Sequence, residues 1–209
     1  MVDELYWDSR IDASRINVTV EGGTVKLAGT VPSYSNRYRA EQAAWCISGV
    51  MDVVDDLTVE YVSPLSLPAD TEIQGWAESL MAWDPTFDEA SITISVGGGI
   101  VTLDGTVDAL WKKSYAENKI SGLRGVLGVE NKLAVVPSHK ISDEVISQDI
   151  VSAMERDALV KAEDVTVEVN DGGVTLKGKV PTWTSKYAAE WDASCTTGVT
   201  YVEDDLQLV

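Results

Sequence analysis

One short motif occurs three times in the sequence, and this repetition constrains the fold more than any other feature. The copies read GGTVKLAGTV from Gly22, GGIVTLDGTV from Gly98 and GGVTLKGKV from Gly172. In each copy, glycines that can adopt a positive φ precede apolar residues at alternate positions. This is the pattern of a tight hairpin turn followed by a β-strand. We therefore expect three copies of one small unit rather than one large domain.

Alignment on a glycine near the end of each strand brings the rest of the sequence into register. These glycines are Gly29, Gly105 and Gly178, so the offsets are 105 − 29 = 76 and 178 − 105 = 73 residues. A second glycine follows 20 residues later in every copy, at Gly49, Gly125 and Gly198. Equal internal spacing places the length difference in the linkers between the copies.

The aligned copies predict an α-β-β-α-β order of elements. The first helix runs from about Asp70 to Trp83 in the second copy and from Ser142 to about Arg156 in the third. In the first copy most of this helix would fall before Met1, so we expect Met1–Asp8 to form at most two turns. The predicted fold is α+β, with three tandem domains, each a three-stranded mixed sheet with helices on one face. The predicted domains are repeat 1 (1–62), repeat 2 (67–137) and repeat 3 (141–209).

The helices carry apolar residues at the spacing of a buried face. The second helix is expected to begin near Ser33, Ala109 and Thr182, and Ser or Thr is a good N-cap residue. The glycines at Gly49, Gly125 and Gly198 are expected to end this helix at the C′ position, and Cys46 and Cys195 are interpreted as small buried side chains. The inward positions of the second helix are Ala40, Ala44, Ile47, Ala116, Ile120, Leu123, Ala189, Ala193 and Thr196. Those of the first helix are Ile73, Ala77, Leu80, Ile146, Ile150 and Ala153.

The whole pattern resembles the BON domain, which is named for bacterial OsmY and nodulation proteins. It consists of an acidic or glycine turn, V-x-L-x-G-x-V, an alanine-rich helix with a glutamate, Gly-Val and V-x-[DN]-x-L. The last piece reads Val53–Leu57, Val129–Leu133 and Val202–Leu206. The resemblance implies a non-catalytic binding module, associated with stress-induced envelope proteins, with phospholipid binding and, in one branch, with potassium binding. Because the shared motif residues are structural, it carries over no catalytic residue and no cofactor.

Charge and chain features exclude several classes of function. The net charge of −18 disfavours nucleic acid as a partner, because phosphate binding needs clustered Lys and Arg. No apolar run is long enough to span a bilayer, and the N-terminus lacks signal-peptide features. We therefore expect a cytoplasmic protein as written, or a periplasmic one if the N-terminus is processed. His139, the only histidine, completes no catalytic triad or metal set.

The candidate contact residues are aromatic side chains on the predicted helices. On the second helix they lie on a face turned away from the predicted core column. They suit contact between repeats, self-association into a homo-oligomer, or contact with phospholipid or an envelope protein, because Trp and Tyr fit surfaces that are half apolar and half wet. Trp76, on the first helix of repeat 2, fits either packing on a neighbour or an exposed contact. The candidates are Tyr34, Tyr38, Trp45, Trp76, Trp111, Tyr115, Trp183, Tyr187 and Trp191.

Charged residues suggest two further interpretations. Basic residues flank the aromatics, and they fit either a solvated helix face or a positive edge for lipid headgroups. Acidic clusters at the last strand, such as Asp55-Asp56 and Asp204-Asp205, are interpreted as solvated strand ends, although carboxylates are also the ligands of hard cations. The alternative function is therefore a module that responds to potassium or calcium. The flanking basic residues are Arg37, Arg39, Lys112, Lys113 and Lys186.

Overall fold

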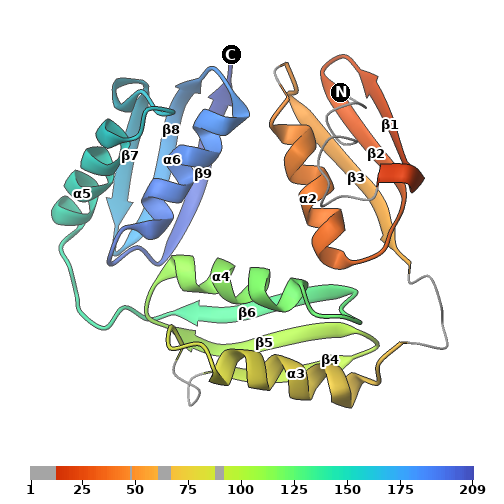
Figure 1. Ribbon diagram of the computed structural model, residues 1–209. Helices are drawn as coiled ribbons and strands as arrows, with labels where there is room; N and C mark the ends of the chain where they lie inside the picture. Colours follow the sequence, from red (N-terminus) through yellow and green to blue (C-terminus); the bar gives the residue numbers. More distant parts are fainter. Residues whose placement is uncertain (1–12, 48, 61–66, 88–91) are drawn as a thin grey trace. The chain divides into compact units, whose positions relative to one another are not determined.

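The computed structural model contains three separate three-stranded sheets, one in each repeat (Figure 1). The structure describes residues 13–47, 49–60, 67–87 and 92–209. Contacts along the chain divide it into two compact units, Met1–Asp104 with Ala116–Lys132, and Gly105–Tyr115 with Leu133–Val209. Every sheet is built from consecutive strands of one repeat, so the predicted α+β class with repeated units is confirmed.

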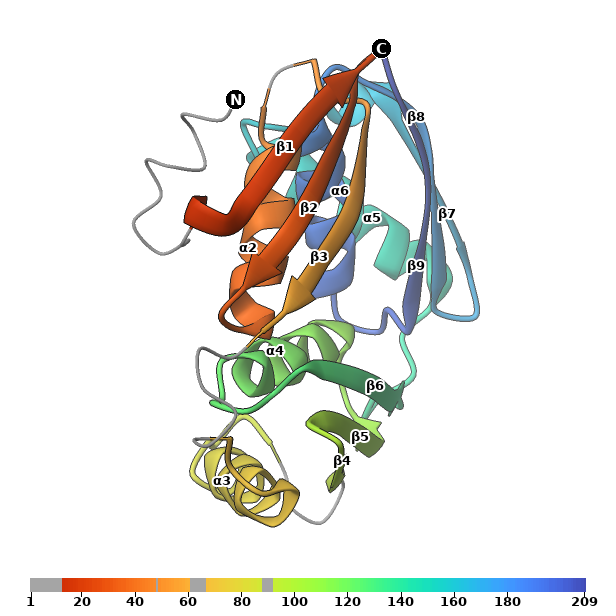
Figure 2. The same ribbon diagram turned by 90° about the vertical axis from the view of Figure 1, so that its right-hand side faces the viewer.

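In repeat 1, the strand order is β1 (Ile16–Glu21), β2 (Thr24–Val31) and β3 (Asp52–Val59). β1 pairs with β2 in the antiparallel sense, whereas β2 pairs with β3 in the parallel sense. The helix α2 (Tyr34–Trp45) makes the crossover that a parallel pair requires, and it packs on β2 and β3. Figure 2 shows α2 behind this sheet. The sheet is therefore mixed, and one face is covered by the helix.

The other two repeats have the same order of elements. Repeat 2 contains α3 (Asp70–Ala82), β4 (Ile92–Gly97), β5 (Ile100–Val107), α4 (Leu110–Ser121) and β6 (Gly128–Val135). Repeat 3 contains α5 (Asp143–Arg156), β7 (Val165–Asn170), β8 (Gly173–Val180), α6 (Trp183–Cys195) and β9 (Tyr201–Leu208). The short 3-10 helices η1 (Ala13–Arg15) and η4 (Ala162–Asp164) lead into β1 and β7.

The second helix begins where the sequence predicts but ends earlier. Ser33 and Thr182 are N-caps whose hydroxyls accept a backbone N–H from the residue three positions later. The predicted C′ position of the glycines is wrong, because α2 ends at Trp45 and Gly49 lies beyond it. Gly49 has a φ of +86° and stands third in a turn closed by the Val50 N–H to the Ile47 carbonyl, at 3.2 Å. A type II turn needs a positive φ at this place.

The buried faces of the helices differ from prediction at one position each. Ile73 and Ala77 of α3 are buried as expected, but the third buried residue is Met81 rather than Leu80. Likewise, Met154 of α5 is buried in place of Ala153. At about 100° per residue, positions i, i+4 and i+8 lie at about 0°, 40° and 80° around the helix, so the three buried residues share one face, which is rotated from the predicted i, i+4, i+7 face. Ile47 lies beyond the end of α2 but, as predicted, packs against the core of repeat 1, where it is partly buried. Thr196 is the C-cap residue of α6 rather than part of its helical face.

The strand glycines allow a close approach between two backbone segments. Gly29 pairs with Ile16, and a Cβ atom built at Gly29 would lie 2.1 Å from the Arg15 carbonyl oxygen. Gly178 stands in the same relation to Asp164, also at 2.1 Å, and both glycines have positive φ. A side chain at either position would force apart the first two strands of the repeat.

Each core lies between the sheet and its helices. In repeat 3 it contains Ile150 and Met154 of α5, Val174 and Leu176 of β8, and Ala189 of α6. The prediction that the cysteines are buried is wrong, because both lie at the exposed end of the second helix. The predicted helix at Met1–Asp8 lies outside the described residues. Within the described part of the chain, no helix is both long and apolar enough to cross a membrane.

Candidate functional site on the second helices

The helix α6 carries a row of three stacked aromatic rings. Trp183 and Tyr187 have ring centroids 5.2 Å apart and planes 17° apart. Tyr187 and Trp191 follow at 6.4 Å and 18°. The spacing of four residues places successive rings on one side of the helix. Tyr187 is 39% exposed and Trp191 is 47% exposed, so the row presents apolar ring surface to solvent.

The other second helices carry shorter aromatic sets. Tyr34 and Tyr38 of α2 align with Trp183 and Tyr187, and Tyr38 is exposed. Trp45 is partly buried and packs against the core of repeat 1. In α4, Trp111 and Tyr115 contact each other at 6.0 Å, but they stand one position further along the helix than the aligned pairs. The three sets are therefore related but not identical.

The first helix of repeat 2 provides isolated aromatics. Trp76 is exposed on α3, and Trp83, at the C-cap of the same helix, is 87% exposed. Trp76 is therefore an exposed side chain on the first helix of repeat 2, whereas the other candidate aromatics lie on second helices. No other ring stacks on either tryptophan among the ring contacts recorded for the described residues.

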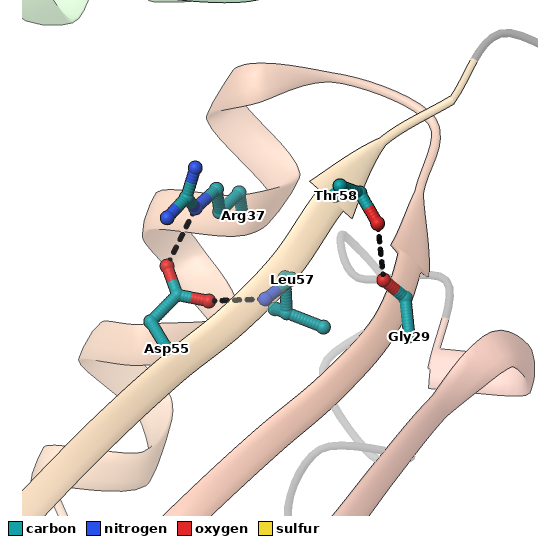
Figure 3. Close-up of polar contacts among 5 residues, drawn as sticks. All are labelled: Gly29, Arg37, Asp55, Leu57 and Thr58. Atoms are coloured by element: carbon teal, nitrogen blue, oxygen red, sulfur yellow. Dashed lines mark hydrogen bonds and ion pairs between the residues drawn. The ribbon is translucent and has the colours of Figure 1, made fainter.

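A polar cluster joins α2 to β3 through Arg37 and Asp55 (Figure 3). The Asp55 carboxylate accepts the Leu57 backbone N–H through Oδ1 at 2.9 Å and the Arg37 Nε–H through Oδ2 at 2.6 Å. The Asp55 side chain is only 13% exposed. Asp55 faces the helix because it shares the inward phase of β3 with Val53 and Leu57. In the same view, the Thr58 hydroxyl donates to the Gly29 carbonyl and joins β3 to β2.

Repeat 3 contains the same cluster with lysine in place of arginine. Asp204 Oδ1 accepts the Leu206 N–H at 2.9 Å, and Lys186 Nζ lies 3.2 Å from Asp204 Oδ2. Lys186 also donates to the Leu206 carbonyl at 2.7 Å. In repeat 2, the corresponding strand residue is the neutral Asn131, whose amide donates to Glu117 at 3.3 Å.

A glutamate on the second helix completes the cluster in each repeat. Burial and, next, the Asp55 carboxylate raise the pKa of Glu41, whereas a hydrogen bond from Trp45 opposes this shift. Burial and then the Asp204 carboxylate likewise raise the pKa of Glu190. Burial and a neighbouring carboxylate both disfavour ionisation of the glutamate, and the nearby basic residue only partly offsets this. The aligned positions thus hold a Glu–Asp pair in repeats 1 and 3.

The repeats match the family model for the BON domain over residues 2–61, 69–137 and 142–209. The chain belongs to the BON-domain family. The resemblance that the sequence motifs indicate is thereby confirmed. The three matched segments each contain one of the three sheets described above.

Other similarities are more distant. The chain is 33% identical over 94 residues to an uncharacterized protein in the gshII 5′ region of Anaplasma centrale, a match that covers 44% of this chain and 62% of that protein. Two structures of CdsD, a structural protein of the type III secretion system of Chlamydia trachomatis, align with all of this chain and with 95% and 90% of their own chains. Their identity is 12% and the TM-score is 0.28 in both cases, which is too low to support a structural comparison.

Three of the five basic residues that flank the aromatics of this BON-domain chain are paired with carboxylates. Arg37 and Lys186 contact the cluster aspartates, and Lys112 contacts Asp108 at 2.7 Å. Arg39 is exposed on α2, and Lys113 is half-buried on α4. Each of the three ion-paired cations therefore has a carboxylate close enough to offset its charge, which weakens the case for a headgroup-binding edge.

Acidic side chains do not form a metal centre in the described ranges. No group of three or more His, Cys, Asp or Glu residues there could hold a metal ion. The acidic strand residues separate by phase: Asp55 and Asp204 face inward, whereas Asp56 faces outward and pairs with Lys26 at 2.6 Å. The interpretation of all these carboxylates as solvated strand ends is therefore wrong for Asp55 and Asp204.

Sequence reasoning missed the Glu–Asp clusters, although a signal for them is present. Asp55 and Asp204 occur at the inward phase of an otherwise apolar period-two pattern, between Val53 and Leu57 and between Val202 and Leu206. A carboxylate at such a position needs partners when it is buried. In repeat 1 the candidate partners are the basic residue 18 positions before Asp55 and the glutamate 14 positions before it, both on the predicted second helix.

Proposed function

We propose that this BON-domain protein is a non-catalytic scaffold that associates with a second copy of itself through the aromatic faces of its second helices. The observation that carries the proposal is the exposed ring row of α6, formed by Trp183, Tyr187 and Trp191. A row of this kind offers rigid apolar area with polar ring edges, which is favourable at protein interfaces.

Two features favour a protein partner over a phospholipid surface. The net charge of −18 repels anionic lipid. Three basic residues that flank the aromatic faces, Arg37, Lys112 and Lys186, already contact carboxylates of their own repeat. The aligned tyrosines of α2 supply a second aromatic face in the same chain, and two faces in one chain would allow assemblies larger than a dimer.

The test compares two variants of the full chain. Tyr187→Ala with Trp191→Ala removes the exposed part of the row, whereas Trp83→Ala removes an even more exposed tryptophan outside it. We expect light scattering after size exclusion to show a mass that rises with concentration for the wild type and for Trp83→Ala, and a constant monomer mass for the double variant. Far-UV circular dichroism confirms that each variant is folded.

Lipid binding is the competing outcome. Flotation with vesicles of neutral lipid and of lipid containing phosphatidylglycerol measures it directly. A wild type that is monomeric throughout but floats, with flotation lost in the double variant, would assign the row to a membrane and refute self-association. Equal behaviour of the double variant and Trp83→Ala in both assays would refute any contact role for the row.

The second candidate function, a response to potassium or calcium, has no comparable observation in its favour among the described residues. Melting in matched potassium, sodium and calcium chlorides distinguishes it. An equal rise in all three salts indicates screening of the net charge alone, whereas a shift specific to one ion would support it.

A further inference from the structure

The last strand of repeat 3 forms a free edge of its sheet. The strand order is β7-β8-β9, so β9 has a neighbouring strand on one side only. Directly after β9, the Val209 N–H donates to the carbonyl of Val180, the last residue of β8, at 3.1 Å. The backbone groups of successive residues in a strand point to opposite sides. The N–H and C=O of Leu206, three positions before Val209, therefore point away from β8.

Two side chains bind both of these backbone groups of Leu206. The Asp204 carboxylate accepts the Leu206 N–H through Oδ1 at 2.9 Å. The ammonium of Lys186, on α6, donates to the Leu206 carbonyl at 2.7 Å and lies 3.2 Å from Asp204 Oδ2. A strand that paired with β9 would need its own C=O and N–H where this carboxylate and this ammonium lie.

Repeat 1 has the same arrangement with a different basic residue. The Glu60 N–H donates to the Val31 carbonyl of β2 at 2.9 Å, so the backbone groups of Leu57 point away from β2. The Asp55 carboxylate accepts the Leu57 N–H at 2.9 Å, and the Arg37 Nε–H binds its other oxygen at 2.6 Å (Figure 3). In both repeats a carboxylate thus binds an N–H group that faces away from the neighbouring strand.

The position of Asp204 favours a role at this edge over a role in core stability. Asp204 lies at the inward phase of β9 between Val202 and Leu206, where an apolar side chain would extend the core. A carboxylate there costs desolvation free energy, and apolar residues of similar volume often stabilise a protein as much as a buried ion pair does. Inward-pointing charges on edge strands, in contrast, are a known means of preventing edge-to-edge pairing.

We propose that the Asp204–Lys186 pair, and the Asp55–Arg37 pair in repeat 1, prevent the last strand from pairing with the same strand of a second copy. β9 is eight residues long, and antiparallel pairing of two identical strands gives a symmetric contact. The pair interrupts this ladder at Leu206, whose donor and acceptor are already bound. The inference is independent of the ring row of α6, because it concerns only the strand edge.

Hydrogen exchange in the wild-type protein tests whether the edge N–H is bound in solution. The Val202 N–H faces the same edge as the Leu206 N–H, but no side chain among the described residues accepts from it. We expect the Leu206 amide to exchange about tenfold more slowly than the Val202 amide, after correction for intrinsic rates. A hydrogen bond to a charged group contributes roughly this factor. Equal rates would overturn the proposal.

A matched pair of variants tests the consequence for association. Asp204→Val removes the carboxylate from the edge, whereas Asp205→Val makes the same change at the neighbouring exposed residue. Both are made in the full chain carrying Tyr187→Ala and Trp191→Ala, so that association through the ring row does not contribute. We expect light scattering to show a mass that rises with concentration to about twice the monomer for Asp204→Val. Asp205→Val should remain a monomer.

Exchange at two protein concentrations distinguishes strand pairing from other association. In dilute Asp204→Val, the Leu206 amide should exchange about tenfold faster than in the parent chain. It should slow again as the mass rises, because a strand of the second copy then supplies the acceptor. Asp204→Asn, which keeps a side-chain acceptor at the edge, should remain a monomer.

Three results would refute the proposal. The first is a natively folded Asp204→Val that stays monomeric at every concentration. The second is equal association of Asp204→Val and Asp205→Val, which would indicate an effect of charge or surface apolarity in general. The third is loss of the native circular dichroism spectrum in Asp204→Val, because it would assign the Asp204–Lys186 pair to stability rather than to the edge.

Discussion

Replacement of Asp143 by alanine tests how strongly the first helix is fastened to its sheet. The substitution removes two hydrogen bonds to a carboxylate, one at the exposed Asp171 N–H and one at the partly buried Gly172 N–H. Water can replace the carboxylate at the exposed Asp171 N–H at little cost. Leaving the partly buried Gly172 N–H without its acceptor costs about 1.5 kcal/mol or more of stability. Loss of an acidic residue at the helix start adds about 0.3–1 kcal/mol. We therefore expect repeat 3 to lose about 2 kcal/mol of stability.

Native-state hydrogen exchange measures this loss repeat by repeat. The amide of Leu176, in the core of repeat 3, should show a free energy of opening lower by about 2 kcal/mol, because the slowest amides report the opening of their whole unit. Asp149→Ala, at an exposed position of the same helix, serves as the control and should leave this value within about 0.5 kcal/mol. Asp143→Asn, which keeps one side-chain acceptor, should fall between the two.

The result that would refute this reasoning is specific. If the Gly172 amide exchanges no faster in Asp143→Ala than in the wild type, the carboxylate is not its acceptor in solution. If Gly172 exchanges faster but Leu176 is unchanged, the contact orders the turn without stabilising the repeat.

Three further predictions follow from individual contacts. Glu190→Gln should stabilise repeat 3 at pH 7 and have no effect below about pH 4.5. The folded-state pKa of Glu190 is raised above its usual 4.5, so its ionisation destabilises the fold increasingly as the pH rises through that folded pKa. Urea unfolding at both pH values measures this effect, and a loss of stability at pH 7 would contradict the prediction. Gly178→Ala should destabilise repeat 3 by about 3 kcal/mol or more, because its Cβ would meet the Asp164 carbonyl, whereas Gly97→Ala, with open space around it, should change thermal unfolding little. Both Cys46 and Cys195 should react with a thiol reagent in the native protein, since both are exposed; a count below two without denaturant would show that one is covered in solution.

The repeated motif alone was sufficient to predict the elements of the unit. Positive-φ glycines at the turns, apolar residues at alternate strand positions and hydroxyl N-caps such as Ser33 and Thr182 are local requirements. Such requirements select the same type of residue at the aligned position of every copy. For this reason the strand starts, the start of the second helix and the core column of Ala40 and Ala44 could be predicted from sequence.

Other features depend on what lies across the core. Whether Met154 or Ala153 meets the sheet depends on the angle of the helix on its strand. Whether Asp55 is a solvated strand end or the buried partner of Arg37 depends on α2 lying over β3. The hydrogen bond from the Gly98 N–H to the Asp70 carboxylate is likewise not predictable from sequence, because it joins residues 28 positions apart. Sequence determined the local conformation of each element, whereas contacts between elements, whose geometry is set by packing, decided which polar groups meet.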